Sequence, residues 1–322
     1  MIVDMFTHLL LLLLTVSGSV APIVEGLEQI ETLQKQKYTK RQFTEIEKAL
    51  EKKEQKIRVM SYNILFDLFD ERWGEENRWK NRSTRVLELI KEISPDILGV
   101  QELYKNQLKD LLSQLGESYA FVSRDPLIGE TNGIFYRKDR FTCIDQLIWD
   151  TPHVSQIHIS DHLTDITLLD SKTDRSFSVL NAHFAFTDIN TRESQAEFAG
   201  KLALSKKNPV LFMGDLNIFP ARPELYKLPF FDGDYIHRVL SGYGLKEARE
   251  WSLLGHVGPL ATFTNEEKDT LPFKGTGTPG IFTDHLYVSP GVTVIVHAIE
   301  PALVDGHFPS DHMPVFADIL IE

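Results

Sequence analysis

Apolar runs that end abruptly at polar side chains are the most informative pattern in this chain. The clearest covers residues 209–217, where Pro-Val-Leu-Phe-Met is followed by Gly-Asp-Leu-Asn. The apolar part predicts a buried strand, and Gly214 suits a tight bend or a close backbone approach at its end. Asp215 and Asn217, two residues apart, can face the same side of an extended chain. A strand that runs into an Asp/Asn turn is the alternative, and this stretch alone leaves both open.

Polar residues stand at the ends of other predicted strands in the same way. Such strands are expected over residues 57–65, 96–100, 177–183, 282–290 and 311–320. The polar residues at strand ends are Asn63, Glu102, His183, Asp215, Asn217, Asp284, Asp311 and His312. No P-loop, Gly-x-Ser-x-Gly elbow or other metal motif in the sequence competes with them. We therefore expect these side chains to share one rim of a sheet.

Helical patterns alternate with the predicted strands. Residues 82–93 form an amphipathic pattern that ends before Pro95, and a second helix is expected around residues 108–115. A third helix is expected to begin with Thr191 as its N-cap, which places Arg192 near the helix start. A series of strand, helix and strand is typical of the α/β class.

The first residues differ from the rest of the chain. Residues 1–24 contain six consecutive leucines followed by small residues, which predicts a cleaved secretory signal peptide. Asp4, and the absence of Lys or Arg before the leucines, also leave open a membrane anchor of about 20 residues or a non-exported apolar tail. Residues 25–56 show helical spacing among Glu, Lys and Gln, which favours a spacer or outer helix over a basic membrane-binding helix. The main domain is expected over residues 57–322.

Composition narrows the classes of function. With 322 residues, 42% of them hydrophobic and 25% charged, the chain is long enough for one large domain and an appendage. The formal net charge of −12 disfavours tight non-specific binding to long nucleic acid without a local basic groove or bound cations. The sole cysteine, Cys143, excludes an internal disulfide, and its neighbours Phe141 and Ile144 predict a buried structural thiol. The three histidines of residues 153–162 lack zinc-site spacing.

The residue types at the strand ends suit phosphoester chemistry. Carboxylate oxygens and Asn carbonyls are hard ligands, which favour magnesium, manganese or calcium over zinc. A divalent cation neutralises charge that develops on phosphate. A histidine oriented by a carboxylate, with an aspartate opposite, can activate water and stabilise a leaving oxygen. Hydrolysis of a phosphate ester is the reaction that these groups fit best.

Five segments, taken in order, resemble the signature of the endonuclease/exonuclease/phosphatase superfamily, the DNase I-like proteins, and in particular its secreted bacterial members. They are Ser61–Asn63, Asp96–Glu102, Asn181–His183, Gly214–Asn217 and Ser310–Pro314. The resemblance covers roughly residues 57–322. It implies a four-layer α/β sandwich, in which two packed mixed β-sheets are flanked by helices and the site lies at one rim. The N-terminal signal or helical extension would precede this domain.

The resemblance also implies roles for the matched residues. Glu102 would be the principal ligand of a magnesium or manganese ion, with Asn63 and Asp311 in support. Asp215 would orient the water or protonate the leaving group, and Asn217 would hold the phosphate.

A second group of matched residues surrounds the phosphate. His183 would hold it as well, oriented by Glu130 from the preceding loop. His312 would be the general base or a transition-state donor, with Asp284 bonded to its other ring nitrogen. Arg192 would contact the phosphate.

The sequence therefore predicts a divalent-metal-dependent phosphoester hydrolase. The alternative is a catalytically idle envelope or binding protein that keeps the same fold. The expected substrate is a nucleic acid, a nucleotide, a phosphoinositide or a phospholipid headgroup, and no protein partner is evident. The leucine block predicts a periplasmic or secreted protein, or membrane attachment through the N-terminal segment if that segment is kept.

Overall fold

The computed structural model describes residues 48–49, 51–68, 70, 74–125, 130–152, 162–186, 188–218, 233–259, 261–263, 282–301, 303–304 and 306–322. The signal or anchor predicted over residues 1–24, and most of the extension over residues 25–56, lie outside these ranges and stay predictions. Within the described part of the chain, no helix is both long and apolar enough to cross a membrane.

The first of two β-sheets contains both chain-terminal strands of the domain. Its strands are β1 (Ile57–Asn63), β2 (Ile97–Leu103), β3 (Tyr119–Val122), β4 (Thr131–Arg137), β10 (His256–Val257), β12 (Val292–Ile299) and β13 (Val315–Ile321). Their order across the sheet is β10-β12-β13-β1-β2-β4-β3. The sheet is mixed, because β1 pairs with β2 in parallel and with β13 antiparallel.

The second sheet is also mixed. Its strands are β5 (Phe141–Asp150), β6 (His162–Asp170), β7 (Arg175–His183), β8 (Val210–Asp215), β9 (Lys246–Glu247) and β11 (Asp284–Val288). Their order is β5-β6-β7-β8-β11-β9, in which β7 and β8 are parallel and β8 and β11 antiparallel.

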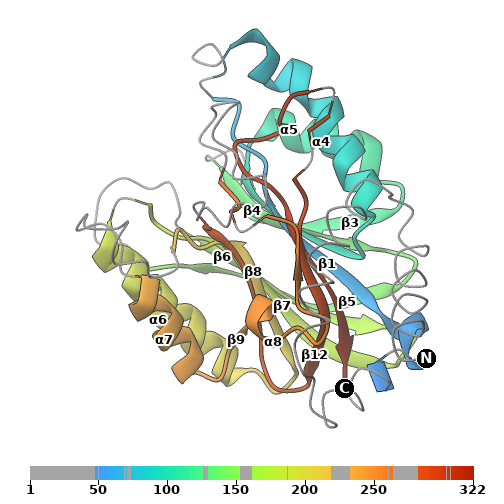
Figure 1. Cartoon of the computed structure of the whole chain (residues 1–322), viewed down its shortest axis with the longest axis vertical. Coiled ribbons are helices and arrows are strands. Elements are labelled where there is room, and N and C mark those ends of the chain that lie inside the picture. Colours follow the sequence, from blue (N-terminus) through green and yellow to red (C-terminus); the bar gives the residue numbers. More distant parts are fainter. Residues whose placement is uncertain are drawn as a thin grey trace, which may run out of the picture.

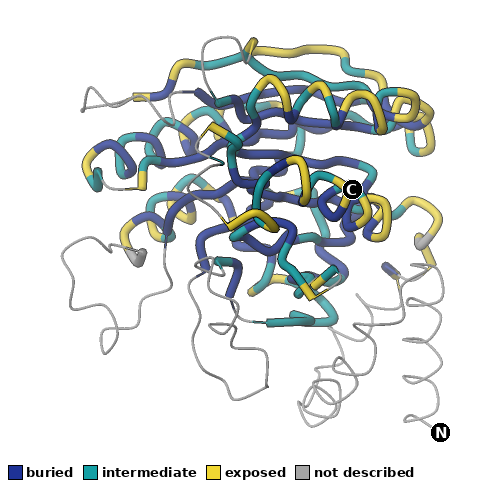
Figure 2. Tube along the Cα trace, turned by 90° about the horizontal axis from the view of Figure 1, so that it is seen from above, coloured by how far each residue is buried: buried dark blue, intermediate teal, exposed yellow. Residues whose placement is uncertain are grey.

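Helices cover the outer face of each sheet (Figure 1). The helices in the described part of the chain are α4 (Trp79–Ile93), α5 (Lys105–Leu115), α6 (Ile189–Ser205), α7 (Gly233–Gly242) and α8 (Ala248–Trp251), with short 3₁₀ turns η1 (Lys53–Gln55) and η3 (Glu75–Asn77). Helices α4 and α5 lie on one side of the molecule, and α6 and α7 lie on the other. Exposed residues are concentrated on the outer helices and at one sheet edge, and buried segments lie between them (Figure 2).

The four-layer order follows from the alternation of apolar side chains along the central strands. Val59 and Ile97 contribute to a core that also contains Val179 and Leu211 of the other sheet, so this core lies between the sheets. Neighbouring residues such as Met60 belong to a second core with α4 and α5. A third core joins β7 and β8 to α6 and α7. The predicted four-layer α/β sandwich is confirmed.

Two predicted helix starts were wrong. Helix α4 begins at Trp79, a turn earlier than expected. Helix α6 is capped by Asp188 rather than Thr191, because the Asp188 carboxylate accepts from the Thr191 backbone N–H at 3.2 Å and from its hydroxyl at 2.9 Å. Thr191 is thus the third residue of the helix, the position whose N–H an N-cap side chain satisfies.

Strand β5 corrects the expectation for the cysteine. Because β5 is the edge of its sheet, Cys143 is only half-buried, and its neighbour Ile144 is 55% exposed. A bulge between Cys143 and Asp145 interrupts the pairing with β6. Of the three histidines in residues 153–162, only His162 lies in the described part; it is buried, and its Nε2 accepts from the Asn132 N–H at 3.0 Å.

Gly214 of β8 lies opposite Ala182 of β7. Its φ is +153°, and a Cβ added there would meet the Ala182 carbonyl oxygen at 1.9 Å. We expect Gly214→Ala to lower the free energy of unfolding by about 3 kcal/mol, the upper range for overpacking. The melting temperature should fall by about 2–4 °C for each kcal/mol.

Thermal unfolding followed by circular dichroism measures this effect. Gly242→Ala is the matched control, because no heavy atom lies within 4 Å of the Cβ that it adds. Equal melting temperatures for the two variants would contradict the claim that Gly214 is sterically required.

Candidate active site

Strand register brings the polar strand ends together at one rim of the sandwich. In the second sheet, His183 of β7 pairs in register with Asp215 of β8, and Asp215 pairs with Asp284 of β11. In the first sheet, Asn63 of β1 is aligned with Gln101 of β2, the residue before Glu102. The ends of the two sheets meet where Asn63 contacts Asp215.

Asp215 is the centre of the site. Its Oδ2 accepts a hydrogen bond from Asn63 Nδ2 at 3.0 Å. The same oxygen lies 3.6 Å from Nε2 of His183 and 3.6 Å from Nε2 of His312. Asp215 is only 2% exposed. One buried carboxylate oxygen therefore faces two imidazole rings.

A second carboxylate supports each ring from behind. Nδ1 of His312 lies 2.8 Å from Oδ2 of Asp284, and Nδ1 of His183 lies 3.2 Å from Oε1 of Glu130. Thr283 donates from Oγ1 to the same Asp284 oxygen at 3.0 Å. A carboxylate bonded to Nδ1 fixes the ring orientation and leaves Nε2 directed at Asp215.

The carboxylates hold both imidazoles in the charged form. Burial lowers the pKa of His183, but Glu130 and Asp215 outweigh burial and raise it to about 10. Burial also opposes the charge on His312, yet Asp284 and Asp215 raise its pKa well above the ordinary value. Burial raises the pKa of Glu130 to about 7. At neutral pH the site presents two imidazolium donors beside Asp215.

Hydrogen bonds link the three predicted metal ligands, Asn63, Glu102 and Asp311, to one another. Nδ2 of Asn63 donates to Glu102 Oε1 at 3.0 Å as well as to Asp215. Ser310 connects Asp311 to Asn63, because the Ser310 hydroxyl donates to the Asn63 carbonyl at 2.8 Å and lies 3.2 Å from Asp311 Oδ1. Burial raises the pKa of Asp311 to about 6, and the charge of Glu102 adds to this rise.

Two neighbouring sets of atoms have the chemistry of a divalent-cation site. In one, the ligand atoms of Asp215, Asp284 and His312 lie within 4.8 Å of one another. In the other, the Glu102 and Asp215 carboxylates converge on the amide of Asn63, where positive charge is favoured. Asp284 and His312 of the first set already bond each other, whereas the second set offers the oxygen-bearing side chains that magnesium prefers.

Asn217 and Arg192 make structural contacts. The Asn217 backbone N–H donates to Asp215 Oδ1 at 3.0 Å, so the Asp/Asn turn that competed with the shared-face interpretation is formed. Asn217 has a positive φ of 47°, and its Nδ2 donates to the Phe184 carbonyl. Arg192 is fully buried, and its Nη1 donates to the carbonyls of Ala185 and Phe186. Phosphate contact by either side chain stays a prediction.

Arg82 lies near the site, although its place in the sequence predicted no functional role. It is buried on α4 and donates to the Ile64 carbonyl, just after Asn63, and to the Pro309 carbonyl, two residues before Asp311. A signal was present in the sequence, because Arg82 shares the apolar face of the helix with Val86 and Leu89.

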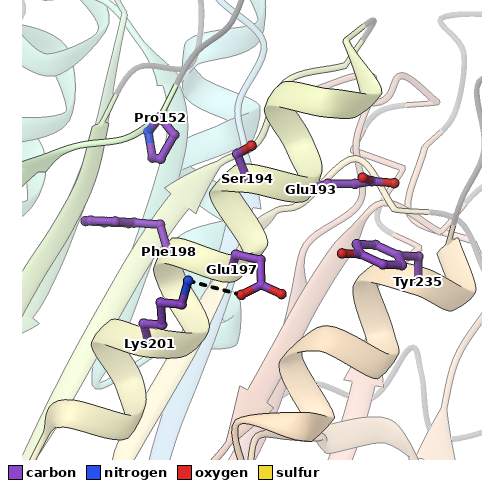
Figure 3. Close-up of a pocket in the computed structure, with 7 residues that line it drawn as sticks. All are labelled: Pro152, Glu193, Ser194, Glu197, Phe198, Lys201 and Tyr235. Carbon is purple, nitrogen blue, oxygen red and sulfur yellow. Dashed lines mark ion pairs between the residues drawn. The ribbon is translucent and has the colours of Figure 1, made fainter.

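A groove of about 470 Å³ lies on the outer face of α6 and α7 (Figure 3). It is lined by Pro152, Glu193, Ser194, Glu197, Phe198, Lys201 and Tyr235. Glu197 and Lys201 form an ion pair of 3.4 Å on its wall. None of the predicted site residues lines this groove.

The sequence profile of the Endonuclease/Exonuclease/phosphatase family matches residues 60–312. Among curated proteins, Protein angel homolog 2 of Danio rerio is 24% identical over 195 residues, which cover 52% of this chain and 34% of the relative. The chain thus spans about a third of the length of that relative.

Solved structures share the fold. An endonuclease/exonuclease/phosphatase from Bacteroides vulgatus is 25% identical with a TM-score of 0.68, over 83% of this chain and 99% of that one. A mannosyl-6-phosphatase of Bacteroides thetaiotaomicron is 21% identical with a TM-score of 0.64, over 82% and 100%. The catalytic domain of human Nocturnin with bound sulfate is 21% identical with a TM-score of 0.61, over 84% and 94%.

Proposed function

This chain belongs to the endonuclease/exonuclease/phosphatase family, and from that premise we propose that it is a divalent-metal-dependent hydrolase of phosphoester bonds. The single observation that carries the proposal is the arrangement around Asp215. Two imidazoles, each supported by its own carboxylate, face one oxygen that also accepts from Asn63, and the same Asn63 amide donates to Glu102. Donors for phosphate oxygens and oxygen ligands for a cation thus lie side by side.

The cation that we propose is magnesium or manganese, held by Glu102 with Asn63 and Asp311. When bound, the ion neutralises negative charge on the phosphoryl group. Three side chains with oxygen ligand atoms suit magnesium or manganese, whereas a zinc site would use histidine or cysteine.

The remaining catalytic roles belong to His312, His183 and Asp215. Each of His312 and His183 is bonded at Nδ1 to a carboxylate, which favours the charged imidazole and leaves the Nε2 N–H to donate to a phosphate oxygen. Asp215 is then the group that accepts a hydrogen bond from the attacking water. Of the two roles open to His312 in the sequence, we therefore propose the transition-state donor. Preorganised donors of this kind supply the largest share of electrostatic stabilisation in many enzymes.

The relatives support the reaction class but differ in their substrates. The Bacteroides thetaiotaomicron structure is by name a phosphatase of a sugar phosphate, and a Danio rerio structure of the same fold contains a single-strand DNA product. We propose a phosphate ester as substrate, to be identified by screening nucleic acids, nucleotides, phosphoinositides and phospholipid headgroups. The catalytically idle alternative is disfavoured, because every predicted carboxylate and imidazole is present.

Metal removal tests the proposed function. Treatment of the full chain with EDTA should abolish hydrolysis, and added Mg²⁺ or Mn²⁺ should restore it. Glu102→Ala should raise the metal concentration needed for half-maximal activity by at least about 10-fold. Loss of a residue that only supports a metal ligand already lowers affinity by about that factor. Glu88→Ala, an exposed change on α4, is the control and should behave as wild type. Hydrolysis that persists in chelator would refute the proposal.

A further inference from the structure

Arg82 is a buried cation, and all of its described hydrogen-bond partners are backbone carbonyl groups. It is 1% exposed. An arginine has five N–H groups, and each has a backbone carbonyl as its partner here. The acceptors are the carbonyls of Asn77 (2.9 Å from Nε), Ile64 and Pro309 (3.3 Å) for Nη1, and Leu65 and Phe66 (3.5 Å) for Nη2.

Three of these carbonyls belong to the turn that follows Asn63. In this turn Leu65 has a φ of +57°, a left-handed conformation that is unfavourable for a bulky residue. The conformation points the Leu65 N–H at Asn63 Oδ1 (3.0 Å) and the Phe66 N–H at Glu102 Oε2 (3.1 Å). The turn that Arg82 holds therefore orients two of the proposed metal ligands.

The Pro309 carbonyl belongs to the segment that carries the third ligand. The next residue, Ser310, bonds both the Asn63 carbonyl and Asp311. The guanidinium thus joins the turn after β1 to the segment before β13. The turn lies 16–18 positions from Arg82 in the sequence, and the Pro309 segment lies 227 positions away.

We infer that Arg82 is a positioning residue for the metal site, which fixes Asn63, Glu102 and Asp311 relative to one another without contacting metal or substrate. This inference rests on the proposed function. A lysine cannot replace it, because one ammonium group cannot reach carbonyls on two segments at once, whereas the planar guanidinium fork can.

Binding of Mn²⁺ to metal-free full chain, measured by calorimetry, tests the inference without reference to activity. Arg82→Lys should raise the Kd for Mn²⁺ by about 10- to 100-fold, the usual effect of losing an outer-shell contact. The rise in melting temperature on adding Mn²⁺ should shrink in parallel. Arg85→Lys is the matched control, because Arg85 is buried on the same helix but bonds the Glu76 carbonyl. Its Kd should stay within about twofold of wild type, as expected of a change outside the site.

The outcomes separate this inference from the proposed function. Wild-type affinity in folded Arg82→Lys overturns the inference and leaves the metal site intact. Absence of Mn²⁺ binding by the wild type overturns the metal site itself, and the inference with it. If Arg82→Lys does not fold, Arg82→Gln takes its place, because its uncharged amide keeps two N–H donors but loses the guanidinium fork that joins the two segments. A raised Kd in that variant supports the inference, and an unchanged Kd overturns it.

Discussion

His312→Ala is expected to lower turnover by about 10²- to 10⁴-fold, the range for lost acid–base or electrostatic assistance. The ring is held at Nδ1 by Asp284 at 2.8 Å and directs Nε2 toward Asp215 at 3.6 Å. Since its charged form is strongly favoured, the alanine variant loses a fixed positive donor at the phosphate. The melting temperature should also fall, because Asp284 loses the cation that compensates its buried charge.

Asp284→Asn tests whether the pair acts as one unit. The amide keeps the shape of the side chain but removes the negative charge that stabilises the imidazolium. We expect a smaller loss than in His312→Ala, and a double variant no worse than His312→Ala alone. Single-turnover rates of the three variants, with melting temperatures, make the comparison.

His307→Ala is the control for a histidine change in the same segment, because the described bonds of His307 are backbone bonds to Val304. It should keep wild-type turnover. Full activity in well-folded His312→Ala would remove His312 from the mechanism and leave only the metal ligands. Additive losses in the double variant would show that Asp284 acts through another group.

Asp215→Asn is the change from which we expect the largest loss, about 10³-fold or more in turnover, because one substitution affects both imidazoles and the water. An amide nitrogen at the Oδ2 position would face the Asn63 donor and two ring nitrogens, where an acceptor is required. Loss of the negative charge should also lower the pKa of His183 and of His312. Kinetics at saturating metal measure the first effect, and NMR titration of the ring nitrogens measures the second.

Asp170→Asn is the matched control for this variant. Asp170 is also a fully buried carboxylate, paired with Arg140 at 3.0 Å, but it lies at the other end of β6. It should destabilise the fold and leave turnover per folded molecule unchanged. Turnover of Asp215→Asn within about tenfold of wild type would contradict a central role, because such a value lies below the usual effect of a general acid or base.

The strands, their order in the chain and the residues at their ends could be predicted from the sequence. Apolar runs such as residues 210–213 identify buried strands, because a strand covered on both faces has no polar positions. A polar residue that stops such a run must lie where the sheet ends. Asn63, His183, Asp215 and Asp284 were located in this way, and the structure brings them to one rim.

Local competition between neighbouring residues was less predictable. Asp188 and Thr191 are both good N-caps, and the chain uses Asp188, whose carboxylate accepts two hydrogen bonds from Thr191. Asn217 could extend the strand or close a turn, and it closes the turn on Asp215. In each case both choices satisfy the backbone, so the difference in free energy is small and tertiary packing selects one.

The contacts that make the site depend on the tertiary structure alone. Asn63 and Asp215 are 152 positions apart, and Arg82 and Pro309 are 227 apart. The hydrophobic period along a strand says which face is buried, but it does not say which strand of the other sheet packs opposite. By itself, the sequence determined the layers, the rim residues and the family. Only the packing of the two sheets decided that one oxygen of Asp215 faces both imidazoles, and that a buried guanidinium joins the ligand-bearing segments.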